Sequence, residues 1–225
     1  MRKAIAAQMT KALAIPVAYT VVEVDMSGVV ALRDANKSSY QEREGIGLTY
    51  DAIVAKATVE ALKNHADFNA HYNDEGHWRR AAVNLGIAVA VEDGLVVPVI
   101  KDADRLSVNG LNHQIRDLAD KSRKGKLSLD DISGGTFTLD NTGWTGSLIT
   151  QPIINAPQVG ILTMESIVKR PVVIATPTGD AIGVKPMMYM CLGFDHRATD
   201  GAQAGNFIND VKRWLESVDS TTAIW

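Results

Sequence analysis

A histidine and an aspartate stand four residues apart, as His196 and Asp200, in the stretch GFDHRATDGAQAGNFINDVKRWL. A histidine at a strand end can present one imidazole nitrogen to a substrate as a general base. A carboxylate four residues further on stays close enough to fix the conformation of the loop or the tautomer of the histidine. Asp200 also stands where a helix N-cap belongs, and Gly201 would let the backbone turn tightly. A loop histidine beside a capping aspartate is the structural alternative, which the motif alone does not exclude.

The segments around this motif alternate between helical and strand patterns. Apolar spacing predicts helices before Pro16, from Ser27 to about Lys37, over 48–65, from Ser107 and from Asp200, with a short capped turn at 128–131. A polar, mobile connection is expected over 37–47. Strands are predicted over 18–26, in two long runs within 81–103 that break at residues 92–94, over 136–141, and over 159–165, 167–174 and 181–194. A glycine-rich stretch after residue 141 predicts a long functional loop.

The order of these elements indicates one α/β domain. Helices and strands alternate, but hairpin turns between the late strands exclude a purely parallel sheet. A large mixed sheet with helices packed on it is therefore expected.

Composition excludes several classes of function. The 225 residues are 46% apolar and 22% charged with a net charge of −3, and no dense Lys/Arg stripe suggests a nucleic acid or an acidic membrane as partner. No apolar run approaches a membrane span or a signal peptide. Cys191 is the only cysteine, which excludes an internal disulfide and a cysteine zinc site, and strand parity places its side chain opposite that of His196, in the core.

The remaining histidines predict no metal centre. Their spacing matches no common ligand pattern, so solvated surface positions are expected for His65, His71, His77 and His113. No G-x-G-x-x-G or phosphate-loop pattern occurs, which disfavours a nucleotide-binding fold.

Four stretches in order carry a family resemblance: MRKAIAAQM, then NLGIAVAVEDGLVVPVIKDAD, then SGGTFTLDNTG followed by PIINAPQVGIL, and finally DHRATDGA. Together they resemble the catalytic domain of the dihydrolipoyl acyltransferases, which form the core of 2-oxo-acid dehydrogenase complexes. The resemblance covers the whole chain. It implies a chloramphenicol-acetyltransferase-like fold, a two-layer sandwich of a large mixed β-sheet and packed helices. Residues 1–225 would be the catalytic core domain, with the lipoyl and peripheral-subunit-binding domains absent from this chain.

The resemblance also implies a reaction and its residues. An acyl group would pass between the thiols of dihydrolipoamide and coenzyme A, with His196 as the general base and the lipoyl group carried on a domain outside this chain. Asp200 would order the turn and pair with an arginine, for which Arg2 is the candidate. Coenzyme A contacts are expected from Ser133, Thr142 and Gly201.

One position departs from the family pattern. The family usually places a serine or threonine hydroxyl, as donor to the oxyanion, where this chain has Asp140. An ionised carboxylate would repel an oxyanion, so Asp140 must be protonated or turned away, or the role must pass to Asn141, Thr142 or a backbone N–H. Asn141 is the preferred donor. Val17 replaces a histidine that many members carry, and this departure is expected to bear on the pocket or on packing more than on the chemistry.

The family assembles as homotrimers that build cubic or dodecahedral cores, with histidine and oxyanion loop supplied by neighbouring subunits. The apolar tail TTAIW is expected to join trimers, with folding onto its own subunit as the alternative. Expected partners are the decarboxylase and dihydrolipoamide dehydrogenase components, in the cytoplasm or in a mitochondrial matrix. A branched-chain or succinyl group is favoured over acetyl. A catalytically weak structural core protein, marked by Asp140, is the alternative function, and a free-standing acetyltransferase fits the motifs less well.

Overall fold

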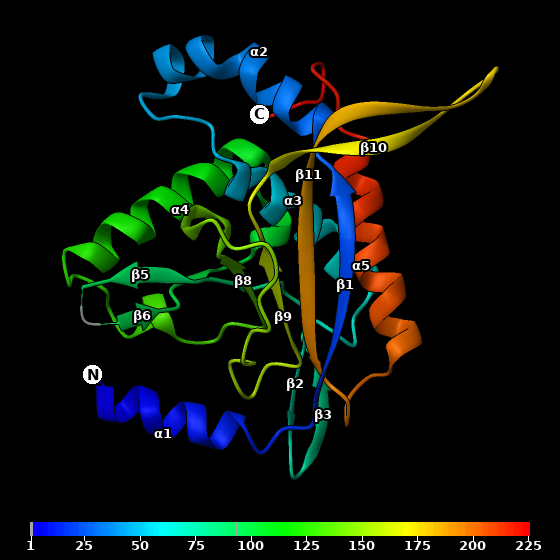
Figure 1. Cartoon of the computed structure of the whole chain (residues 1–225). Helices are drawn as coiled ribbons and strands as arrows, with labels where there is room; N and C mark the ends of the chain where they lie inside the picture. The colour runs from blue at the N-terminus through cyan, green and yellow to red at the C-terminus, as the bar shows by residue number, and fades with distance from the viewer. Residues whose placement is uncertain (1, 93) are drawn as a thin grey trace.

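A mixed β-sheet and the helices on one of its faces form the two layers of the chain (Figure 1). The computed structural model describes residues 2–92 and 94–225, without the side chains of residues 2–5 and 11. The strand order is β1 (Val17–Asp25), β11 (Gly179–Asp195), β9 (Gly160–Met164), β8 (Phe137–Asn141), β4 (Leu85–Ile87) and β7 (Val99–Ile100). Strand β8 runs parallel to β4 and β9, and the other pairings are antiparallel. The predicted fold class is confirmed.

The helices are α1 (Arg2–Ala12), α2 (Ser27–Glu44), α3 (Tyr50–Asn64), α4 (Val108–Arg123) and α5 (Gly201–Glu216), with short 3₁₀ turns η1 (Ala103–Arg105), η2 (Asp130–Ile132) and η3 (Gly143–Thr145). Aromatic rings join α5 to the sheet. Phe207 stacks on Phe68 with 4.7 Å between ring centroids and lies 5.5 Å from Phe137. None of the helices in the described residues is long and apolar enough to cross a membrane.

The two faces of the sheet differ in what covers them. Because side chains alternate along a strand, Phe137, Leu139 and Asn141 point toward the helices while Thr138 and Asp140 point the other way. The loop of residues 142–159 lies over this second face, where the Tyr19 hydroxyl donates to the Pro152 carbonyl. We call it the loop-covered face.

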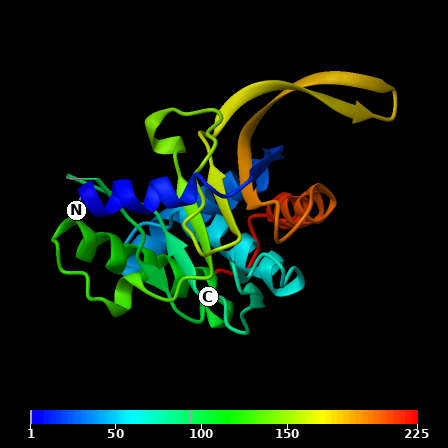
Figure 2. The ribbon, with the colours of Figure 1, turned by 90° about the horizontal axis from the view of Figure 1, so that it is seen from below.

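A long hairpin leaves the body of the molecule. Strand β10 (Val168–Thr176) pairs with the first half of β11, and the two strands project outward together (Figures 1 and 2). Three apolar side chains on it are largely exposed: Val173, Ile182 and Val184.

The apolar stretch 85–100 differs from the prediction. Two long strands buried on both faces are expected, but the chain makes four short ones, of which β5 (Val89–Val91) and β6 (Gly94–Val96) form a separate hairpin. The predicted turn includes residue 93, which is outside the described residues. Leu95 is 47% exposed, so burial on both faces is wrong for this hairpin. An apolar run does not reveal where a chain leaves one sheet for another.

Two further elements also differ from prediction. The helix from Ser27 continues to Glu44, so the expected connection from residue 37 is wrong. Tyr40 explains the difference, since it is fully buried and donates its hydroxyl to Asn109, and Gly45 ends the helix in the left-handed region at φ 72°. A polar hairpin, β2 (Ala70–Asn73) with β3 (Gly76–Arg79), forms where only a loop is expected.

The C-terminal tail packs on its own chain, the alternative named above. Ile224 is 1% exposed, and its carbonyl accepts from the Asn109 backbone N–H. The Trp225 indole donates to Glu44 at 2.8 Å, and the Arg43 guanidinium lies over the Trp225 ring.

Candidate active site

His196 follows the last residue of β11, in the turn that leads to α5. Its backbone N–H donates to the Pro16 carbonyl at 3.0 Å, which fixes the turn against the residue before β1. The imidazole is exposed and lies 5.6 Å from the Phe194 ring. The side chain is therefore held at the backbone while its ring nitrogens face outward.

A half-buried ion pair, which was not predicted from the sequence, flanks His196. Asp195 is 1% exposed and accepts from the backbone N–H, Nε and Nη2 of Arg197, the last at 2.7 Å. The Arg197 guanidinium lies 4.6 Å from the ring centroid of Tyr72 on β2. Asp195 and Arg197 directly precede and follow His196 in the sequence, and this Asp-His-Arg order could have indicated an ion pair around the histidine.

Asp200 is the N-cap of α5, as predicted. Its carboxylate accepts from the Gln203 backbone N–H at 2.8 Å, and the Gln203 side chain accepts from the Asp200 backbone N–H at 3.2 Å. The expected partner Arg2 has a side chain outside those described, so that pairing stays a prediction. The tight turn expected at Gly201 is wrong, because its φ is not positive and an added Cβ would meet nothing within 4 Å.

The two halves of the predicted site lie at opposite ends of the sheet. Asn141 pairs with Met164 across β8 and β9, and Met164 pairs with Met190 across β9 and β11. His196 comes six residues after Met190, and at about 3.3 Å per residue this is a separation of about 20 Å along the strands. One chain alone therefore does not bring His196 together with Asp140 or Asn141.

Asn141 faces the helix layer and is already hydrogen-bonded. Its amide Nδ2 donates to Asp51 Oδ1 at 3.0 Å, and its Oδ1 accepts from the Gly143 backbone N–H. It lines a cavity of about 510 Å³, together with Asp51 and Trp144 and the two arginines of α4, Arg116 and Arg123.

Glu165 is a buried carboxylate on the loop-covered face that the sequence analysis also missed. It is 2% exposed and accepts hydrogen bonds from the hydroxyls of Thr142, Thr150 and Thr163 at 2.6, 2.6 and 2.9 Å. Burial alone raises the pKa of Glu165, but these hydrogen bonds outweigh it and hold the pKa below its ordinary value. Gly143 fits only as glycine, because a Cβ there would come 2.5 Å from the Glu165 backbone carbonyl.

Asp140 lies on the same face as Glu165. It is partly exposed, and its cross-strand neighbour Thr163 gives its hydroxyl to Glu165. Burial, and then the negative charge of Glu165, raise the pKa of Asp140.

The three residues expected at coenzyme A do not gather in one chain. The Thr142 hydroxyl donates to Glu165. Ser133 is exposed before the start of β8, where its carbonyl accepts from Lys101, and Gly201 is exposed at the start of α5. Ser133 and Gly201 lie toward the His196 end of the sheet, and Thr142 lies at the opposite end.

The other histidines are hydrogen-bonded. The expectation of solvated surface positions is wrong for His65, His71 and His77, which are partly buried, whereas the side chain of His113 is 43% exposed. His65 contacts Asp210, His71 contacts Gly135 and Arg80, His77 contacts Asp67, and His113 contacts Glu44. Among the described residues, no group of three or more His, Cys, Asp or Glu is placed to hold a metal ion. Cys191 is 1% exposed, as predicted.

Comparison with known proteins gives three relatives with different acyl groups. The lipoamide acyltransferase component of the branched-chain α-keto acid dehydrogenase complex of Bacillus subtilis is 44% identical over 100% of this chain and 53% of its own length. The acetyltransferase component of the Corynebacterium glutamicum pyruvate dehydrogenase complex is 45% identical over 88% of this chain and 30% of its own. The succinyltransferase component of the Rickettsia typhi 2-oxoglutarate dehydrogenase complex is 42% identical over 87% of this chain and 48% of its own length. The chain thus spans about half or less of these relatives.

Solved structures agree in fold. A probable dihydrolipoamide acetyltransferase of Listeria monocytogenes superposes with a TM-score of 0.95 at 44% identity, over 100% of this chain and 95% of that one. A dihydrolipoamide acetyltransferase of Azotobacter vinelandii superposes with a TM-score of 0.90 at 30% identity, over 96% of this chain and 88% of that one. That protein was studied for the catalytic role of a serine, a histidine and an asparagine. The cubic core of a pyruvate dehydrogenase complex gives the same values. Chloramphenicol acetyltransferase shares the fold, with a TM-score of 0.56 at 13% identity over 93% of this chain and 94% of that one.

The histidine and asparagine studied in the Azotobacter protein are four residues apart, which is the spacing of His196 and Asp200. A family model described as the 2-oxoacid dehydrogenases acyltransferase catalytic domain matches residues 1–223. This chain therefore belongs to the 2-oxoacid dehydrogenase acyltransferase family.

Proposed function

We propose that this chain transfers an acyl group between the thiol of a dihydrolipoyl group and the thiol of coenzyme A, with His196 as the general base. Family membership supports the reaction class. The observation that carries the proposal is the His196 turn, which holds an exposed imidazole and is fixed by a backbone hydrogen bond to Pro16 and by the ion pair of Arg197 with the buried Asp195.

The chemistry needs a base because a free thiol has a pKa of about 8.5 and is only a few per cent thiolate near pH 7. The neutral His196 imidazole takes the thiol proton as the sulfur attacks the thioester carbonyl carbon. The carbon–oxygen double bond opens to an oxyanion. When the intermediate collapses, the bond to the other sulfur breaks, and His196 returns the proton to that leaving sulfur. Asp200 does not touch the reacting atoms in this scheme and positions the turn through its cap.

The complete site would form between two subunits of a homotrimer. A separation of about 20 Å between His196 and the end of β8 within one chain leaves each chain with two incomplete halves. A neighbouring copy that places its β8 end beside His196 completes both. The cubic core among the structural relatives supports assembly into a larger particle.

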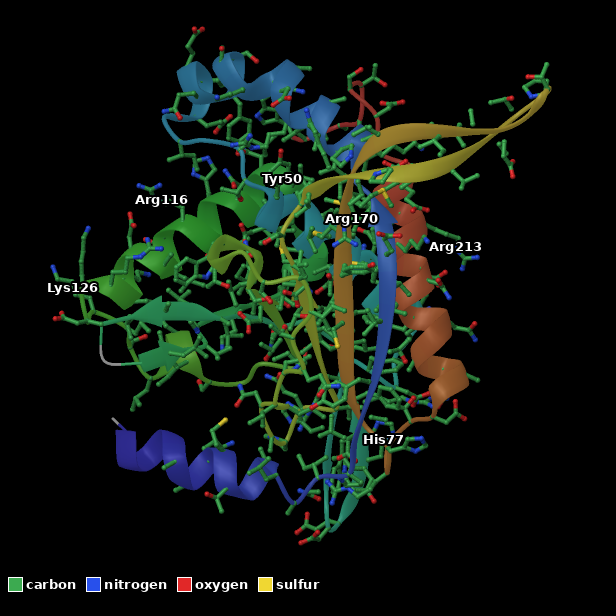
Figure 3. All side chains as sticks on the ribbon, viewed as in Figure 1. Tyr50, His77, Arg116, Lys126, Arg170 and Arg213 are labelled. Carbon is green, nitrogen blue, oxygen red and sulfur yellow. The ribbon has the colours of Figure 1, made fainter. Side chains whose placement is uncertain are left out.

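The phosphate end of coenzyme A is placed in the cavity beside Asn141, on the helix-covered side of the sheet. Arg116 and Arg123 are among its lining residues, and their guanidinium groups, which pair with Asp120, suit phosphate oxygens; Arg116 projects from α4 (Figure 3). The lipoyl group would arrive on a separate domain. Decarboxylase and dihydrolipoamide dehydrogenase components would be its partners, in a bacterial cytoplasm. A branched-chain acyl group is proposed, because the branched-chain component of Bacillus subtilis matches the whole chain while the acetyltransferase and succinyltransferase components of Corynebacterium glutamicum and Rickettsia typhi match less of it. Acetyl is the alternative, since the probable acetyltransferase of Listeria monocytogenes also matches the whole chain.

The first test is coenzyme A-dependent acyl transfer to dihydrolipoamide with acetyl, succinyl and isobutyryl donors. We expect the isobutyryl donor to be turned over fastest. His196→Ala should lose at least two orders of magnitude, whereas His113→Ala, a matched change at a histidine remote from the motif, should keep activity. A wild type that is as inert as His196→Ala with every donor, yet forms large particles, would establish the structural core protein instead, which Asp140 gives a specific reason to consider.

The second test asks whether the site is shared between chains. His196→Ala is mixed in equal amounts with Asp140→Ala/Asn141→Ala, which removes both side chains at the end of β8, and the mixture is unfolded and refolded together. Neither parent is expected to be active. Random assembly leaves both intact halves at about one in four interfaces, so about a quarter of wild-type activity should return. An inactive mixture of well-assembled particles would argue against a site between subunits.

A further inference from the structure

The proposed reaction passes through a tetrahedral intermediate whose oxyanion needs a hydrogen-bond donor. Losing one such donor typically slows an acyl transfer by about 10²–10³-fold. Three side chains at the end of β8 are candidates, Asp140, Asn141 and Thr142, and the structure separates them by what each already binds.

Thr142 has its hydroxyl donor engaged within the chain, and Asn141 has one of its two amide N–H donors engaged. The Asn141 amide bonds to Asp51 on the helix-covered side of the sheet. The Thr142 hydroxyl donates to the buried carboxylate of Glu165. The bond to Asp51 holds the Asn141 amide on the helix-covered side, and use of the Thr142 hydroxyl would remove one of the hydrogen bonds to Glu165.

Asp140 is in the opposite situation. It points to the loop-covered face, part of its side chain reaches the surface, and its carboxyl has no hydrogen-bond partner among the described residues. Groups on this face of the sheet include Thr138 from β8 itself, the cross-strand partner Thr163, Glu165 directly after β9, and the thiol of Cys191 from β11. Further along β11 and β1 the same face carries Tyr189, Tyr19 and Glu23, and Glu23 pairs with Arg170. The Thr138 hydroxyl is bonded to Gln158, and no cation from the described residues pairs with Asp140.

Burial, and after it the charge on Glu165, favour the neutral form of Asp140. Glu165 is anionic because its hydrogen bonds from three threonine hydroxyls favour the charged form. A second, unpaired carboxylate close to it would add like-charge repulsion to the cost of burial. Protonation of Asp140 removes both costs, which agrees with the direction in which its pKa is shifted.

We propose that Asp140, as a neutral carboxylic acid, donates the hydrogen bond that stabilises the oxyanion, and that its partly buried position together with the buried charge of Glu165 keeps it neutral. Asp140 thus acts as a catalytic residue, and Glu165 is a positioning residue that acts through it. The proton stays on Asp140 throughout. The thiol proton moves to His196 and back to the leaving sulfur, so the balance of the reaction is unchanged. This inference rests on the proposed function.

The test compares kcat across pH for variants at these two positions, with the acyl donor that the wild type uses best. Asp140→Ala should lose about 10²–10³-fold, and Asp140→Asn and Asp140→Ser, which carry donors that do not titrate, should recover most of that loss. The wild type should lose activity as pH rises through the pKa of Asp140. That alkaline decline should be absent in Asp140→Ser.

Glu165→Gln supplies a readout that a purely structural role would not move. Removing the charge lowers the pKa of Asp140, so the alkaline decline should shift to lower pH in Glu165→Gln. In Asp140→Ser/Glu165→Gln the profile should match that of Asp140→Ser. If Glu165→Gln does not fold, the activity of Asp140→Asn relative to that of Asp140→Ala still tests whether Asp140 acts as a hydrogen-bond donor.

Two results would overturn the inference while leaving the proposed function intact: an Asp140→Ala variant as active as the wild type, or an Asp140→Asn variant as inactive as Asp140→Ala while both remain folded. Failure of the proposed function has a different signature, since the wild type itself would then be inert with every donor.

Discussion

The ion pair beside His196 gives a prediction whose size follows from its burial. Asp195 has a side chain that is 1% exposed, and Arg197, its partner, is 36% exposed. Arg197→Leu removes both guanidinium hydrogen bonds and leaves a buried carboxylate with the Arg197 backbone N–H. Breaking a fully buried pair costs about 3–5 kcal/mol. Because Arg197 is open to water on one side, solvent can partly replace it, and we expect a loss of about 2–3 kcal/mol in the free energy of unfolding.

A matched control separates this effect from the loss of any arginine. Arg213 projects from the outer side of α5, is 74% exposed and pairs with Asp210 (Figure 3). Arg213→Leu should change stability by no more than about 0.5 kcal/mol. At about 2–4 °C per kcal/mol for a chain of this size, Arg197→Leu should lower Tm by about 5–10 °C, measured by calorimetry at one protein concentration.

The asymmetry of the pair sharpens the test. Asp195→Asn removes the buried charge and leaves an arginine that water can reach, so the double variant Asp195→Asn/Arg197→Leu should be more stable than Arg197→Leu alone. If Arg197→Leu is no worse than Arg213→Leu, or if the double variant is no better than the single one, the reasoning about an uncompensated buried charge is refuted.

Three further outcomes are expected. Asp200→Ala should lower the free energy of unfolding by about 1 kcal/mol through loss of the N-cap, measured by urea unfolding, and Asp200→Asn should lose much less; equal losses would contradict the capping role. Because the pKa of Glu165 is lowered on folding, its stabilising effect is present above its unfolded pKa of about 4.3 and disappears as the pH falls through the folded value. The stability difference between wild type and Glu165→Gln should therefore shrink from pH 7 to pH 3, and a constant difference would count against this. Burial, and then the charge of Glu165, raise the pKa of Cys191 to about 11. Its thiol should therefore stay unlabelled by a thiol reagent at pH 8 until urea unfolds the chain. Rapid labelling of the native protein would show instead that the thiol is accessible.

Local sequence patterns predicted most of the helices and strands. Strand alternation and helical spacing placed β1, α3, α4, β8, β9 and α5 because those signals lie within a few neighbouring residues. The last two turns of α2 were missed because they look polar, and the single residue that anchors them, Tyr40, gains its partner Asn109 from a distant helix. The β2–β3 hairpin has too few apolar residues to reveal its alternation.

The site divides in the same way. His196 and Asp200 were found because their motif is local, and the cap of Asp200 follows from sequence alone. Glu165 could not be identified, since its role depends on hydroxyls that loop closure brings to it. The engagement of Asn141 by Asp51, 90 positions away in the chain, was equally out of reach, and so was the separation of the two half-sites, which requires the strand order.

The pairing of β1 with β11 constrains when this protein can fold during synthesis. Val17 pairs with Asp195, so this strand finds its partner only after the residues between them have been made. At about 5–20 residues per second, the ribosome needs roughly 10–35 s between the two strands. During that interval β1 leaves the ribosome with its backbone edges unpaired, which is the condition that invites aggregation or capture by a chaperone. Completion of this sheet is therefore a late event, which depends on the release of the last third of the chain.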